Sequence, residues 1–217
     1  MRIPLALFLL SLALAPAQQP APPGAGLEVI ALRPDFHVIA GAGANISVQS
    51  GTDGLILVDS GMADRSEAVL AAVRGISQRP IRFVINTTAD AEHVNGNAKI
   101  AGAGESLTPA SRSLLATGAS IIAHENVLTR MSAPTGKQPP FPLELWPTET
   151  FFRKQKNMYL NHEGIQIQWQ PAAHTDGDTI VYFRRSDVIA VGDLIDTRHF
   201  PISPPILPPR AVSIIGK

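Results

Sequence analysis

Two short apolar runs separated by a segment of helical periodicity limit what this chain can fold into. Residues 55–58 and 81–85 are almost continuously apolar, as expected of strands that are covered on both faces. Between them, apolar residues recur at helical spacing, at Val69, Leu70, Val73 and Ile76. Strands that alternate with helices in this way predict an α/β layered domain.

The rest of the pattern fits such a domain. Alternating or apolar segments predict further strands at residues 27–33, 37–40, 44–50, 119–123, 179–184 and 188–191. Thr-Asp-Gly at residues 52–54 predicts a hairpin turn. We expect one helix over residues 92–103, a helical turn or two over residues 126–131, and one strand over residues 158–170.

The charge balance and the residue types present bear on which partners and metal ligands are expected. Lysine plus arginine and aspartate plus glutamate both number 18, so there is no electrostatic reason to expect a nucleic acid or an anionic membrane as partner. The chain of 217 residues contains no cysteine. A metal site would therefore use histidine and carboxylate ligands, since thiolate ligands are absent.

The N-terminus is typical of an exported protein. Arg2 precedes an apolar stretch over residues 3–14, and small residues follow at Ala15 and Ala17. We expect a signal peptide over residues 1–17, cleaved after Ala17, a flexible lead-in over residues 18–26, and a secreted or periplasmic location. The apolar stretch is short for a membrane span, so no stable span is expected after cleavage. An uncleaved anchor is the alternative.

Residues that could bind a metal or take part in catalysis follow three of the predicted strands. Residues 86–97 follow the strand at 81–85, His174 begins a polar turn after the strand that ends near residue 170, and Asp193 follows the strand at 188–191. In α/β folds, functional residues gather beyond the carboxyl ends of strands. These three segments are therefore candidates for one shared site.

The order of these segments resembles the metallo-β-lactamase superfamily of zinc hydrolases, in particular its exported members. The segments are Asp59-Ser60-Gly61, Asn86-Thr87, His93-Val94-x-Gly-Asn, His174-Thr175-x-Gly-Asp and Gly192-Asp193. The resemblance runs from about residue 27 to about residue 201. It implies an αββα sandwich over residues 27–217 with its C-terminal part missing, because the family pattern continues through further helices. An incomplete sandwich would expose apolar surface and favour oligomerisation.

The histidine motif of the family is altered here. The family pattern is H-x-H-x-D-H. At its first three defined positions this sequence has Thr88, Asp90 and Glu92 instead, and only His93 matches. The resemblance makes His174 a further metal ligand and Asp193 the carboxylate that bridges two metals. A last family histidine is expected downstream of the point where this sequence ends.

The resemblance and the chemistry of the residues give a candidate ligand set of Asp90, His93, His174 and Asp193. Glu92 is the candidate to orient a water molecule or act as general base. Zinc is the expected cofactor, with one ion rather than two, and carboxylate ligands make manganese or iron alternatives. A position near a helix N-terminus predicts a neutral, metal-competent His93.

Several of these residues have a simpler interpretation. Asp90 is also a favoured helix N-cap, and Thr88 suits a turn that satisfies its own amides. Asp59 and Thr88 are candidates to orient the ligands, while His124 suits a structural role better than a metal site. The sequence thus predicts an exported metal-dependent hydrolase that acts on an ester, amide, lactam or thioester bond of a small molecule. A non-catalytic binding protein that has lost zinc ligands is the alternative.

Overall fold

The structure, a computed structural model, describes residues 26–107, 118–134, 136 and 139–195. The predicted signal peptide, nearly all of the predicted lead-in and the C-terminal part of the predicted domain lie outside these residues. Among the described residues, no helix has the length and apolar character needed to cross a membrane.

The larger of two sheets has seven strands that follow one another in sequence order. They are β1 (Glu28–Arg33), β2 (Phe36–Ala42), β3 (Ala44–Gly51), β4 (Gly54–Val58), β5 (Ile81–Ile85), β6 (Ser120–His124) and β7 (Glu149–Phe151). Strands β1 to β4 form an antiparallel meander, whereas β4 to β7 are parallel. All five residues of β4 are buried, as its continuous apolar run predicts.

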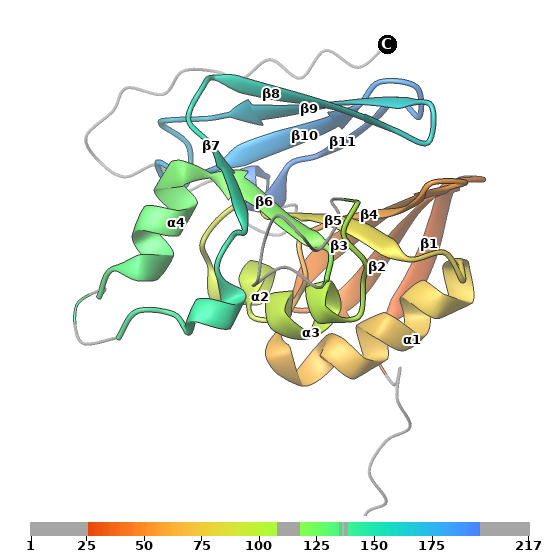
Figure 1. Ribbon diagram of the computed structural model, residues 1–217, viewed down its shortest axis with the longest axis horizontal. Helices are drawn as coiled ribbons and strands as arrows, with labels where there is room; N and C mark the ends of the chain where they lie inside the picture. Colours follow the sequence, from red (N-terminus) through yellow and green to blue (C-terminus); the bar gives the residue numbers. More distant parts are fainter. Residues whose placement is uncertain (1–25, 108–117, 135, 137–138, 196–217) are drawn as a thin grey trace, which may run out of the picture.

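The second sheet is antiparallel and has the order β11-β10-β9-β8. Its strands are β8 (Gln155–Leu160), β9 (Glu163–Trp169), β10 (Thr179–Phe183) and β11 (Val188–Ala190). The two sheets pack face to face (Figure 1). Phe36, Ile56 and Ile85 of the first sheet and Ile165 and Phe183 of the second belong to the apolar core between them.

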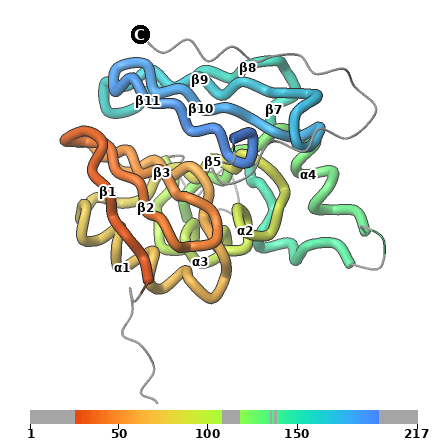
Figure 2. The backbone as a smooth tube through the Cα atoms, turned by 180° about the vertical axis from the view of Figure 1, so that it is seen from behind, coloured from red at the N-terminus to blue at the C-terminus, as the bar shows by residue number. Residues whose placement is uncertain are grey.

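Helices cover the other face of the seven-stranded sheet, and Figure 2 shows the same layers from behind. They are α1 (Ser66–Ile76), α2 (Ala91–Val94) and α3 (Asn97–Gly102), while α4 (Glu125–Ser132) lies at the β6–β7 edge. The described residues also contain the short 3-10 helices η1 (Ala63–Arg65), η3 (Leu143–Leu145) and η4 (Gly192–Leu194). Val69, Leu70 and Val73 form the inner face of α1, at the spacing that predicted this helix.

The predicted α/β fold class is confirmed, and the described residues form three layers of the αββα sandwich. No described helix covers the outer face of the four-stranded sheet. Tyr159 and Ile189 are largely exposed there. One row across this face contains Asn157, Gln166 and Tyr182 beside Ile189, so the face mixes polar and apolar side chains.

The prediction of one helix over residues 92–103 is wrong, because α2 and α3 are separate. The loop after β4 takes the carbonyl of His93, which accepts hydrogen bonds from Ser60 N at 2.8 Å and Ser60 Oγ at 3.0 Å. Gly96 N donates to Gly61 O, and a Cβ on Gly96 would lie 2.2 Å from Ser60 O. A long-range contact therefore interrupts the helix at Asn95-Gly96.

The single strand predicted over residues 158–170 is also wrong, because β8 and β9 form a hairpin. Its turn consists of Asn161 and His162, with φ angles of 55° and 59°. Consecutive positive φ angles are typical of a two-residue hairpin turn, and asparagine tolerates them.

Candidate metal site

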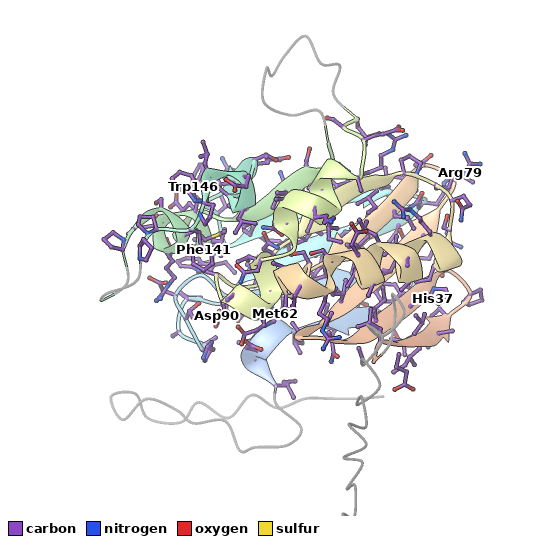
Figure 3. The ribbon with its side chains drawn as sticks, turned by 90° about the horizontal axis from the view of Figure 1, so that it is seen from below. His37, Met62, Arg79, Asp90, Phe141 and Trp146 are labelled. Atoms are coloured by element: carbon purple, nitrogen blue, oxygen red, sulfur yellow. The ribbon has the colours of Figure 1, made fainter. Side chains whose placement is uncertain are left out.

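The predicted site residues come from elements that meet at one edge of the two sheets. Asp59 follows β4, Asp90 follows β5, His174 lies in the loop between β9 and β10, and Asp193 lies in η4 after β11. Figure 3 shows Asp90 beside the blue ribbon of η4. The convergence predicted from three strand ends is therefore present.

Three of the four candidate ligands form one group. Asp90, His174 and Asp193 each offer a donor atom within 4.8 Å of the others. Asp90 Oδ2 lies 3.4 Å from His174 Nδ1. The three side chains are 35%, 53% and 37% exposed respectively, so solvent and a small molecule can reach the group.

His93 adjoins this group from the buried side. Its Nε2 atom lies 3.0 Å from Asp193 Oδ1, but it is buried and has no hydrogen bond of normal geometry among the described residues. Its other ring nitrogen, Nδ1, lies 2.8 Å from Asp59 Oδ2. Asp59 thus holds the ring through Nδ1, and Nε2 faces the carboxylate of Asp193, a member of the ligand group.

The expectation of a neutral His93 is wrong for the metal-free protein. Burial lowers the pKa of this side chain, but the neighbouring carboxylates of Asp59 and Asp193 outweigh burial and raise the pKa to about 11. Two carboxylates on opposite sides of a ring stabilise its cationic form. A helix of only four residues supplies too weak a dipole to oppose them.

Asp59 and Thr87 hold the His93 ring in place through buried hydrogen bonds. Asp59 is buried with a φ of 65°, and its carboxylate accepts from Thr87 N at 2.8 Å and Thr87 Oγ1 at 2.7 Å. Thr87 also sets the position of η4, since a Cβ on Gly192 would lie 2.4 Å from Thr87 Oγ1. Sequence reasoning missed this role of Thr87, although its place directly after Asn86 at the end of β5 was the available signal.

Asp90 occupies the N-cap position of α2, but its side chain makes no capping hydrogen bond. Instead, Asp90 Oδ2 accepts from Thr88 Oγ1 at 3.1 Å. Thr88 therefore orients the candidate ligand rather than the amides of its own turn. The contact favours the ligand interpretation of Asp90 over the capping interpretation.

Glu92 is exposed on α2, and its Cβ would lie 3.2 Å from a Cβ built on Gly43. It is not a member of the ligand group found among the described residues. A general base need not be a metal ligand, so the role of Glu92 stays a prediction.

His124 is not a member of this group, and its surroundings are those of a structural residue. It is buried, and its Nδ1 accepts from Asn126 N at the start of α4. Its ring stacks on Trp169, with centroids 4.3 Å apart. Burial lowers the pKa of His124, which favours the neutral ring that this capping hydrogen bond requires.

The donor set fits a divalent metal ion. Bonds of about 2.1 Å in tetrahedral geometry place donor atoms about 3.4 Å apart, close to the observed spacing of Asp90 and His174. The Nε2 atom of His93 lies next to Asp193 of this group, although His93 itself is not one of its three members. Two imidazoles and two carboxylates suit zinc, and the carboxylates also suit manganese or iron.

Comparisons with known proteins agree with this fold. Residues 40–107 match the family model described as the metallo-beta-lactamase superfamily. A metallo-β-lactamase of Cronobacter sakazakii with a HARLDQ motif is 18% identical, with a TM-score of 0.61 over 81% of this chain and 64% of that chain. The structure described as the first subclass B3 metallo-β-lactamase with an active-site glutamic acid is 18% identical, with a TM-score of 0.56 over 71% and 56%.

A third structure, the subclass B3 metallo-β-lactamase MEM-A1 from a soil metagenome library, is 17% identical, with a TM-score of 0.57 over 72% of this chain and 57% of that chain. This chain spans less than two thirds of the length of each of the three structures. At these identities the likeness shows the fold. A search of curated proteins found no match.

Proposed function

We propose that this chain, which has the metallo-β-lactamase fold, is a metal-dependent hydrolase with a single metal ion. The observation that carries the proposal is the group formed by Asp90, His174 and Asp193, with the unsatisfied Nε2 atom of His93 beside it. A group of three protein ligands with access to solvent has the features of a catalytic rather than a structural metal site.

Each side chain has a role in this proposal. Asp90, His93, His174 and Asp193 would hold the ion, and Asp59 keeps the His93 ring oriented through Nδ1. A zinc ion bound there would supply a Lewis acid that polarises a scissile carbonyl and lowers the pKa of water. Glu92, on the exposed side of α2, is our candidate to accept the proton from the attacking water.

The substrate that we propose is a small molecule with an ester, amide, lactam or thioester bond. The exposed side chains of His174 and Asp193 leave the group open on one side. Export with cleavage after Ala17 belongs to the same proposal and places the substrate outside the cytoplasm. Sequencing the N-terminus of the protein recovered from the periplasm or medium tests this part.

A binding protein without hydrolysis is the second candidate. It is favoured by one observation, the altered motif, in which Thr88 and Asp90 occupy positions where the family pattern has histidines. A site with a weakened set of metal ligands could bind a small molecule without turnover. The two candidates share the metal and differ in catalysis.

The test is hydrolysis by zinc-loaded protein of a chromogenic lactam, an ester, an amide and a thioester. We expect turnover of at least one, reduced about a hundredfold or more in Asp90→Asn and His174→Ala. His162→Asn, which changes an exposed turn histidine, is the matched control and should retain full activity. Zinc binding without turnover of any substrate would establish the binding protein, and absence of zinc binding would overturn both.

A further inference from the structure

His174 is a metal-ligand candidate carried by a loop. The loop between β9 and β10 has no helix or strand of its own, and the His174 side chain is half exposed. A loop ligand must be held in place, or ordering it consumes part of the binding free energy. The side chains that hold this loop therefore bear on metal affinity.

One residue of the loop, Asp176, accepts hydrogen bonds from three side chains of two other elements, α4 and β9. Its carbonyl oxygen accepts from Asn126 Nδ2 at 2.9 Å and from Trp169 Nε1 at 2.6 Å. Its carboxylate accepts from Arg130 Nε at 2.5 Å. Asn126 and Arg130 are four residues apart on α4, so they share one face of this helix.

Helix α4 and Trp169 at the end of β9 are themselves held together by His124. His124 caps α4 through Asn126 N and stacks on Trp169 with the rings 7° from parallel. The loop also lies directly against α4, because a Cβ on Gly177 would lie 3.1 Å from Val127 N. Helix α4 and Trp169 thus form one platform for the loop.

We infer that α4 is a positioning element for the metal site, and that Asn126 and Arg130 hold His174 near Asp90 through their contacts with Asp176. The inference rests on the proposed function, because it makes His174 a metal ligand. Neither Asn126 nor Arg130 would contact the metal or the substrate. Their removal should release the loop while the rest of the fold stays intact.

The test compares Arg130→Met and the double variant Asn126→Ala/Arg130→Met with the native protein. Zinc affinity is measured by competition with a chromophoric chelator, and hydrogen exchange of residues 170–178 is measured by mass spectrometry on metal-free protein. Arg74→Met, at an exposed arginine of α1, is the matched control. Arg130→Lys, which keeps the positive charge, should lose less zinc affinity than Arg130→Met and show slower exchange in the loop.

We expect zinc affinity to fall about fivefold in Arg130→Met, since exposed ion pairs contribute little singly, and about 10–100-fold in the double variant. Exchange in residues 170–178 should quicken in the same order, with Tm and the exchange of α1 unchanged. Unchanged exchange in this loop would overturn the inference, whatever the zinc affinity. Faster exchange with no zinc binding in any protein would support the platform and contradict the proposed function.

Discussion

At the scale of single residues, the site is a competition between a proton and a metal ion for one nitrogen. His93 lies between Asp59 and Asp193, and this arrangement raises its pKa to about 11. The sequence correctly places both carboxylates after strands, but it does not show that they lie on either side of one ring. That is why a neutral histidine was expected, whereas the two carboxylates raise the pKa of this side chain.

Metal binding should therefore release a proton and strengthen with pH. The protonated ring stabilises the metal-free fold fully below pH 6.5, and this contribution is lost as pH rises through about 11. Between these values a metal must displace the proton, so affinity should rise about tenfold per pH unit. Calorimetry at pH 8 in buffers of different ionisation enthalpy should show about one proton released per metal, whereas pH-independent binding without proton release would contradict this assignment.

The altered motif can be tested by restoring it. The double variant Thr88→His/Asp90→His places two imidazoles where the family pattern has them, and zinc affinity should rise about tenfold because zinc prefers neutral nitrogen to oxygen donors. Chelator competition measures the change, with circular dichroism to verify folding, since Thr88 is buried. A folded variant with no gain would count against a surviving site.

At the scale of elements, local patterns predicted most helices and strands but not where distant contacts interrupt them. Strand β5 begins and ends where its apolar run does. The break between α2 and α3 depends on Ser60 and Gly61, which come from a loop more than 30 residues earlier. The side chain of Asp90 likewise does not cap α2 but accepts a hydrogen bond from Thr88. No local sequence pattern distinguishes these two roles of an aspartate.

The turn between β8 and β9 joins the two sheets through Asn161. This buried side chain accepts from Asp53 N at 2.8 Å and donates to Gln49 Oε1 at 2.8 Å and Gly54 O at 2.9 Å. Asn161→Ala should lower the free energy of unfolding by about 2–4 kcal/mol, because buried partners lose their hydrogen bonds and a positive φ becomes strained. Urea unfolding measures the loss, and Asn157→Ala on the exposed face of β8 should change it by less than about 0.5 kcal/mol. Equal effects of the two substitutions would show that the hydrogen bonds of Asn161 contribute nothing specific to stability.

At the scale of the whole molecule, the site is built where both sheets end. Asp59 and Asp90 follow strands of the seven-stranded sheet, whereas His174 and Asp193 follow strands of the other. An ion held by Asp90, His174 and Asp193 would link the two sheets, and it would do so only in the folded state. Metal binding and folding stability should therefore be coupled.

Zinc should stabilise the native protein against heat. At a free zinc concentration about 100 times Kd the gain is about 2.7 kcal/mol, which corresponds to a rise in Tm of about 5–10 °C for a domain of this size. Differential scanning calorimetry should show the rise in native protein and in His162→Asn but not in Asp90→Asn/His174→Ala. The same rise in the latter variant would place the stabilising metal elsewhere.

The central claim is that a metal site survives in this fold despite its altered histidine motif. Elemental mass spectrometry of the purified protein tests it most directly, alongside a folded His93→Ala/His174→Ala variant. We predict about one equivalent of a transition metal in the native protein, with zinc first, and its loss in the variant. No bound metal in the native protein, even after incubation with zinc, manganese and iron, would contradict the account.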